Sequence, residues 1–139
     1  MIQWNKVIEE NMKAQAERAY PFECCGFIIG SHSNDFEIAT DLIPADNTHS
    51  GEKRRRFYID PLSYMRAERS AEQKGLSIIG VYHSHPDHPP IPSDEDKRHA
   101  LPGLHYPIIS VKNGSVTSIR NWVLKETREF EETTILKNQ

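Results

Sequence analysis

Apolar residues recur along the chain at two spacings, one typical of helices and one typical of strands. From residue 2 to residue 19 they recur at a nearly helical spacing, which predicts a helix that ends before Pro21. A second helix is predicted to begin at Asp60-Pro61 and to end at Gly75, and a short one to cover residues 94–100. Short apolar or alternating runs predict the strands, which cover residues 24–30, 36–43, 76–82, 106–111 and 115–124.

Two pairs of neighbouring strands are expected to form hairpins. The turn-like residues 31–35 separate the first pair, and Asn113-Gly114, a strong turn signal, separates the second. Helices and strands do not alternate as regular βαβ units, so the predicted fold class is α/β of the mixed α+β kind, with a mixed β-sheet flanked by helices. We expect one domain over residues 1–124 and a charged, peripheral C-terminal tail over residues 125–139.

Length, charge and cysteine content restrict the class of protein. The 139 residues suit one domain, and a net charge of −3 argues against a nucleic-acid-binding protein. No apolar run approaches the ~18 residues of a membrane span, and the first six residues contain no apolar signal segment, so we expect a cytoplasmic protein without membrane contact. The adjacent Cys24 and Cys25 are expected to be buried small residues, neither paired in a disulfide nor ligating zinc.

The residues with the clearest chemical meaning follow the strand that ends near Tyr82. His83 and His85 are two positions apart, so both side chains point to the same face of an extended strand and can bind one metal ion. Zinc in catalytic sites takes three protein ligands and a water, and Asp96 is the expected third ligand. Four prolines between residues 86 and 92 stiffen the connection, while Ser93-x-x-Asp96 is typical of a helix N-terminus that would fix the aspartate.

The same segment also fits a second kind of metal site. Residues 83–88 match HxHxDH, the two-metal signature of metallo-β-lactamase-like hydrolases, in which Asp87 and His88 would be ligands. That fold normally needs a longer chain and further ligands well downstream, where only His99 and His105 follow. These two histidines, together with His32 and His49, lack the context of a metal site and are interpreted as ordinary residues.

The complete stretch resembles a known family motif. His83-Ser84-His85-Pro86, six further residues and Ser93-x-x-Asp96 are similar to the JAMM motif of MPN-domain metalloproteases, HSHP-x6-SxxD. Residues 21–26 resemble the PxExCG segment of the small bacterial members, and residues 56–61 and 79–82 fit the family as well. The resemblance covers roughly residues 5–124 and implies an MPN/JAMM-like fold of the cytidine-deaminase-like type.

The resemblance also implies a role for each site residue. His83, His85 and Asp96 would bind one Zn²⁺ per chain, Glu23 would act as general base, and Ser93 would help stabilise the oxyanion. Such a set is chemically coherent, because zinc acidifies water and polarises a carbonyl while a carboxylate takes up the proton. The role of Glu23 rests on the resemblance alone, since it lies sixty residues before His83.

The family further implies a substrate class. Members cleave peptide or isopeptide bonds beside ubiquitin-like tails, and the small bacterial form resembles peptidases that process sulfur-carrier proteins after a C-terminal Gly-Gly. The loop of residues 44–57, which contains the basic run 53–56, is expected to contact such a carrier, and an exposed strand edge would permit a homodimer. Two alternatives remain at this point: a non-catalytic MPN scaffold, which would bind no metal, and the two-metal hydrolase.

Overall fold

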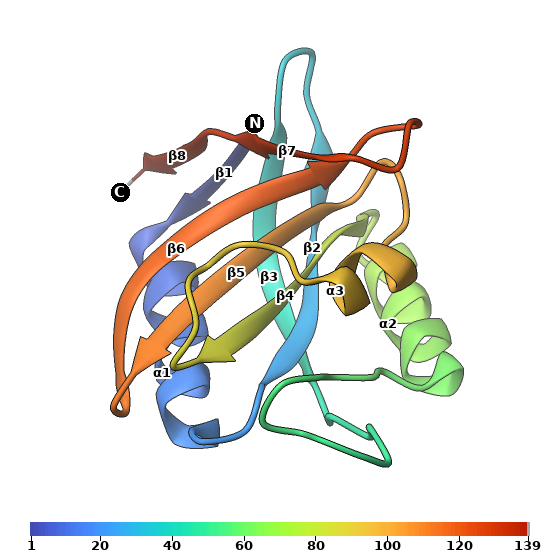
Figure 1. Cartoon of the computed structure of the whole chain (residues 1–139). Helices are drawn as coiled ribbons and strands as arrows, with labels where there is room; N and C mark the ends of the chain where they lie inside the picture. Colours follow the sequence, from blue (N-terminus) through green and yellow to red (C-terminus); the bar gives the residue numbers. More distant parts are fainter. Residues whose placement is uncertain (139) are drawn as a thin grey trace.

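One sheet of eight strands organises residues 1–138, which the computed structural model describes (Figure 1). Its strand order is β7-β6-β5-β4-β2-β3-β1-β8. The elements along the chain are β1 (Ile2–Asn5), α1 (Lys6–Ala19), β2 (Cys25–His32), β3 (Glu37–Ala45), α2 (Pro61–Gln73), β4 (Ser77–Pro86), α3 (Asp94–His99), β5 (His105–Lys112), β6 (Ser115–Leu124), β7 (Phe130–Thr133) and β8 (Ile135–Asn138). The expected class, a mixed sheet flanked by helices, is confirmed.

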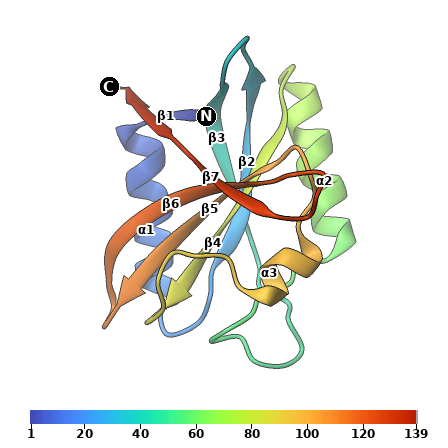
Figure 2. The ribbon, with the colours of Figure 1, turned by 45° about the horizontal axis from the view of Figure 1, so that its top comes forward.

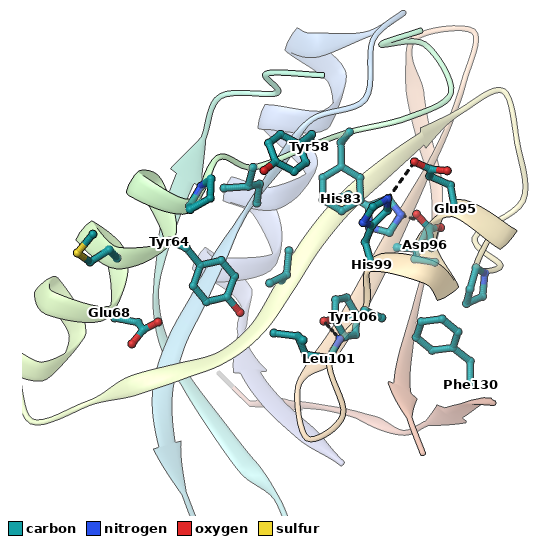
Figure 3. A pocket seen from close by; sticks show the side chains of 18 residues that line it. Tyr58, Tyr64, Glu68, His83, Glu95, Asp96, His99, Leu101, Tyr106 and Phe130 are labelled. Atoms are coloured by element: carbon teal, nitrogen blue, oxygen red, sulfur yellow. Dashed lines mark hydrogen bonds and ion pairs between the residues drawn. The ribbon is translucent and has the colours of Figure 1, made fainter. Parts of the chain in front are cut away.

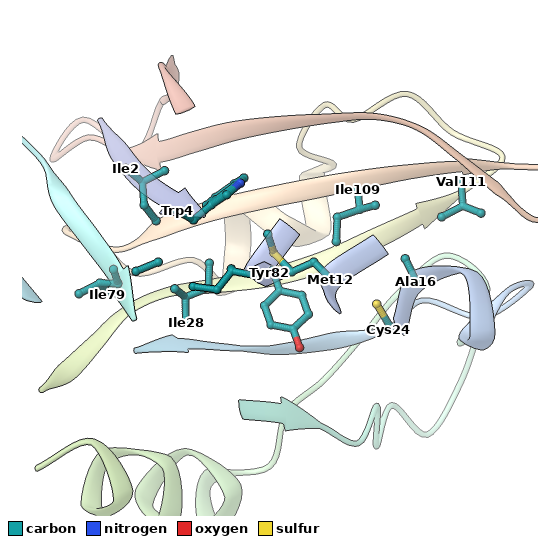
Figure 4. Packing of buried hydrophobic residues seen from close by; sticks show 12 residues of the cluster. Ile2, Trp4, Met12, Ala16, Cys24, Ile28, Ile79, Tyr82, Ile109 and Val111 are labelled. Atoms are coloured by element: carbon teal, nitrogen blue, oxygen red, sulfur yellow. The ribbon is translucent and has the colours of Figure 1, made fainter. Parts of the chain in front are cut away.

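The strand β4 lies in the middle of the sheet, antiparallel to β2 and parallel to β5. On one face of the sheet, α1 packs over a cluster that includes Met12, Ile28 and Tyr82 (Figure 4). On the other face, a second cluster contains Ala67 of α2 and Val81 of β4. Side chains alternate along a strand, so His83 and His85, two and four positions after Val81, lie on the same face of the sheet, toward α2 and α3.

The two edge strands β7 and β8 are joined by a single residue, Thr134, although they stand at opposite ends of the strand order. The carbonyl of Thr134 accepts the amide of Ile2 at 3.2 Å. The sheet is therefore strongly curled, and its two edges approach each other where β7 passes into β8 (Figure 2). Residues 125–139, expected to be a peripheral tail, thus contribute one strand to each edge of the sheet over residues 130–138.

The first helix starts later than the apolar spacing predicted. Residues 2–5 form β1, which pairs with β3 and β8, and Asn5 then caps α1 by accepting the amide of Ile8 at 2.9 Å. Ile2 and Trp4, both almost fully buried, alternate as strand residues do. Ile2 fits a helical spacing as well, and the strands that pair with β1 are distant in sequence, so the local pattern alone was misleading.

Most other predicted elements are present within a few residues of the expected bounds. Both hairpins form, and the turn between β5 and β6 has positive φ angles of 51° at Asn113 and 86° at Gly114, as a tight hairpin turn requires. The side chain of Asp60 caps α2 and Pro61 is its first residue. Both cysteines are buried and free, as expected. Among residues 1–138, no helix is long and apolar enough to cross a bilayer.

Candidate metal centre

The C-terminal end of β4 places two imidazoles side by side, as the alternation of strand side chains predicted. The Nε2 atoms of His83 and His85 lie 3.1 Å apart, and the two residues are only 1% and 5% exposed. The Nδ1–H of His85 donates to the carbonyl of Pro89 at 2.9 Å, which leaves its Nε2 lone pair free for a metal. Phe57 stacks on the ring of His83 with centroids 4.5 Å apart and limits its rotation.

The short helix α3 supplies the third candidate ligand. Ser93 and Asp96 form a reciprocal capping box: the Asp96 amide donates to the Ser93 hydroxyl at 3.0 Å, and the Ser93 amide donates to Asp96 Oδ2 at 2.9 Å. The same Oδ2 lies 3.2 Å from the Nε2 atoms of both His83 and His85. The predicted cap therefore also directs the carboxylate at the histidines.

These three ligand atoms have the spacing of a metal site. Bonds of about 2.0–2.1 Å from zinc to tetrahedral ligands place the ligand atoms ~3.3 Å from one another. The three distances among His83, His85 and Asp96 are 3.1, 3.2 and 3.2 Å. Two imidazole nitrogens and one carboxylate oxygen are a donor set that zinc accepts, with one tetrahedral position left for water. The residues therefore fit the zinc ion that the sequence predicted.

The protonation states agree with a ligand role. Burial lowers the pKa of His83, which favours the neutral imidazole that binds metals. Burial alone would raise the pKa of Asp96, but the adjacent His83 and His85 hold it below its usual range, so this carboxyl is ionised. Two neutral nitrogens and one anionic oxygen thus converge on one point.

Glu23 lies beside this cluster, two residues before the start of β2. It is 3% exposed, and its Oε1 has no hydrogen-bond partner among the described residues. Burial and the charge of Asp96 raise the pKa of Glu23 to about 9, and a divalent cation nearby would lower it again. Glu23 lines a cavity of about 330 Å³ together with His85 and Ser93. The structure thus brings together all five residues that the sequence proposed for the site.

A second, mostly apolar cavity of about 400 Å³ opens on the other side of the cluster, between α2 and α3 (Figure 3). His83 and Asp96 form part of its wall, and the other lining residues include Tyr64, Tyr106 and Phe130. The three candidate metal ligands therefore stand between two cavities, one lined by Glu23 and one lined in part by aromatic rings.

Among residues 1–138, the only group of three or more potential ligands that meets at one point is His83, His85 and Asp96. His88 is not part of it. Asp87 instead accepts hydrogen bonds from the Tyr20 hydroxyl at 2.7 Å and the Asn113 amide at 3.0 Å. The structure therefore gives the two-metal alternative no second cluster in the described part of the chain.

Two residues that position the site were not singled out from the sequence. Ser84, between the two histidines, bonds to the residue after Glu23, and Asn47 bonds to Glu23 itself. Ser84 lies inside the HSHP motif, but a serine in a strand gives no sign of its partner. Asn47 stands in a polar loop where asparagine is common, so nothing marked it out.

Comparison with known proteins agrees with this geometry. Residues 5–125 match the family model described as prokaryotic homologs of the JAB domain. The chain belongs to this family. It is 34% identical over 111 residues to a desampylase of Haloferax volcanii, covering 79% of this chain and 76% of that protein. It is 29% identical over 120 residues to a probable TtuB-protein conjugate cleaving protease of Thermus thermophilus, covering 86% and 74%.

The fold of this JAB-family chain also has solved counterparts. A solution structure of a Desulfitobacterium hafniense protein superposes with a TM-score of 0.88 at 30% identity, covering all of this chain and 94% of the other. The resemblance to the JAMM/MPN family that residues 83–96 indicated is thereby confirmed for family and fold.

Proposed function

We propose that this protein is a zinc-dependent JAMM-type metallopeptidase. The observation that carries the proposal is the triangle of ligand atoms from His83, His85 and Asp96, with sides of 3.1–3.2 Å, beside the buried carboxyl of Glu23. The names of the relatives support a hydrolase, because one is a desampylase and one a protease that cleaves protein conjugates. The complete set of candidate ligands, His83, His85 and Asp96, favours this proposal over a non-catalytic scaffold, which would bind no metal.

The chain's own residues divide the work of peptide hydrolysis. His83, His85 and Asp96 would hold zinc, which when bound supplies a Lewis acid that acidifies water and polarises a carbonyl. Glu23 takes the proton from the attacking water and passes it to the leaving amine. Ser93 Oγ accepts the Asp96 amide, and its O–H remains available to donate to the developing oxyanion.

The substrate we propose is a ubiquitin-like protein of the sulfur-carrier type, cleaved at the peptide or isopeptide bond after its C-terminal Gly-Gly. The relatives that act on conjugates support this class. The basic run 53–56 lies next to the site: Arg55 lines the cavity of Glu23, and Arg56 pairs with Glu95 of α3 at 3.8 Å. Arg54 lies over the ring of Phe22, 6.0 Å from its centroid. We propose that this run contacts the carrier.

The experiment that tests the function is cleavage of two substrates by zinc-loaded protein. One is a ubiquitin-like protein whose Gly-Gly is extended by a peptide, and the other carries an isopeptide-linked lysine. We expect Glu23→Gln to keep its zinc and to lose about 10²–10⁴-fold in turnover. Full activity of this variant would exclude Glu23 as the base, and wild-type protein that cleaves neither substrate would contradict the proposal. Arg54→Glu with Arg55→Glu should raise KM, and an unchanged KM would exclude the basic run from the contact.

A further inference from the structure

The backbone of Glu23 is held by the loop that carries the basic run. Its amide donates to the carbonyl of Lys53 at 2.8 Å, and its carbonyl accepts a hydrogen bond from the side chain of Asn47 at 3.1 Å. On the other side, the next residue, Cys24, is bonded to Ser84 of β4. The proposed base thus stands between two anchors, one on the histidine strand and one in the loop.

Asn47 uses its complete hydrogen-bonding capacity at this place. Its Nδ2 donates to the carbonyls of Glu23 at 3.1 Å and Arg56 at 3.0 Å. Its Oδ1 accepts the amides of His49 and Tyr58, both at 3.1 Å. Two carbonyls face one end of the amide and two N–H groups face the other, so the partners themselves determine its orientation. The donor end therefore binds the backbone of Glu23, the proposed base, and the acceptor end joins two parts of the loop to each other.

We propose that Asn47 is a positioning residue for Glu23 and that its donor end keeps the carboxyl of Glu23 in register with the metal ligands; the catalytic part of this inference rests on the proposed function. The buried Oε1 of Glu23 has no partner of its own among the described residues, so the backbone determines where the carboxyl lies. General-base catalysis depends on hydrogen-bond reach, and a displacement of about 1 Å can cost about 10²-fold in rate.

A substitution can test the donor role of the Asn47 side chain separately from its acceptor role. Asn47→Asp is nearly isosteric and keeps an acceptor for the His49 and Tyr58 amides, but it turns a carboxylate oxygen toward the carbonyls of Glu23 and Arg56. The matched control is Thr48→Val, which removes the hydrogen bond from the Thr48 hydroxyl to the Tyr58 carbonyl, 3.1 Å long. The control weakens closure of the loop without touching Glu23.

The first measurement is amide hydrogen exchange of the metal-free protein by NMR, which needs no activity. We expect the Glu23 amide to exchange roughly tenfold faster in Asn47→Asp than in wild type, because its neighbouring anchor is lost, and to be little changed in Thr48→Val. A Glu23 amide that exchanges at the wild-type rate in Asn47→Asp would overturn the inference.

The second measurement is steady-state cleavage by zinc-loaded protein, with metal content and thermal melting checked for each variant. Asn47→Asp should bind zinc and lose about 10–100-fold in kcat with little change in KM, whereas Thr48→Val should affect mainly KM. A wild-type kcat in Asn47→Asp, or equal losses of kcat in both variants, would overturn the inference. Wild-type protein that cleaves nothing would contradict the proposed function and this catalytic role with it, while hydrogen exchange decides the anchorage separately.

Discussion

The amide of Cys24 donates to the hydroxyl of Ser84 at 2.8 Å, and the amide of Ser84 donates to the carbonyl of Cys24 at 3.1 Å. This reciprocal pair joins the residue after Glu23 to the residue between the two histidines. The pairing of β2 with β4 continues from there, with Cys25 opposite His83. The distance between the proposed base and the metal ligands is therefore set by the register of two central strands, sixty residues apart in sequence.

Ser84→Ala tests this connection. Ser84 is fully buried, so the variant removes the hydroxyl that accepts the hydrogen bond of the Cys24 amide, in a place that water does not reach. We expect the free energy of unfolding to fall by about 1–3 kcal/mol, measured by urea denaturation. Ser118→Ala, on the exposed side of β6, is the control and should change it by less than about 0.5 kcal/mol. Equal stabilities of the two variants would contradict the role of Ser84.

Arg128 links the C-terminal segment to the helix of the third ligand. Its guanidinium donates to the carbonyls of Lys97 at 2.7 Å and Ala100 at 3.0 Å, at the end of α3. A cation there also suits the negative end of the helix. Because Arg128 is exposed, we expect Arg128→Gln to lower the free energy of unfolding by about 1 kcal/mol and to weaken zinc binding in a competition titration.

The control for Arg128 is Lys125→Gln, which removes an exposed pair with Glu131 of 3.7 Å. Such pairs contribute about 0–1 kcal/mol, so the zinc affinity of this variant should equal that of wild type. If Arg128→Gln binds zinc as wild type does, the hydrogen bonds of Arg128 have no part in holding α3 at the metal centre.

The lowered pKa of His105 should make the stability of the protein depend on pH. Burial lowers its pKa, although the hydrogen bond to Glu37 acts in the opposite direction, and the N-terminal amine and His32 lower it further. Its Nε2–H donates to Glu37 at 3.1 Å, and its Nδ1 accepts from Asn121 at 2.8 Å, so the neutral ring is already satisfied. Between this lowered pKa and the unfolded value of about 6.5, the unfolded chain binds more protons, so stability falls as pH falls.

We expect the stability difference between wild type and His105→Gln, measured in chelator, to shrink below pH 6.5 by at most about 1.4 kcal/mol per pH unit. A difference for His105→Gln that is constant from pH 7.5 to pH 5 would show that this histidine does not titrate differently in the folded state.

The convergence of the three candidate metal ligands could be predicted from sequence because local geometry places them. Alternation along β4 aligns His83 with His85, and the capping box turns Asp96 toward them over a short connection. Glu23 could be assigned only through the family resemblance, because strand register is a non-local property. The same reason explains why β1 was missed: it is a strand only because β3 and β8 lie beside it. Asn47 gave no signal, since its four partners come together only in the folded loop.

The most direct test of the account is the metal content of freshly purified protein by elemental analysis, comparing wild type with His85→Ala and His88→Ala. We expect about one zinc per chain in wild type and in His88→Ala, and loss of this zinc in His85→Ala. Two metals per chain, with one lost in His88→Ala, would show the two-metal site instead. No metal in wild type after addition of zinc would contradict a metal centre formed by His83, His85 and Asp96.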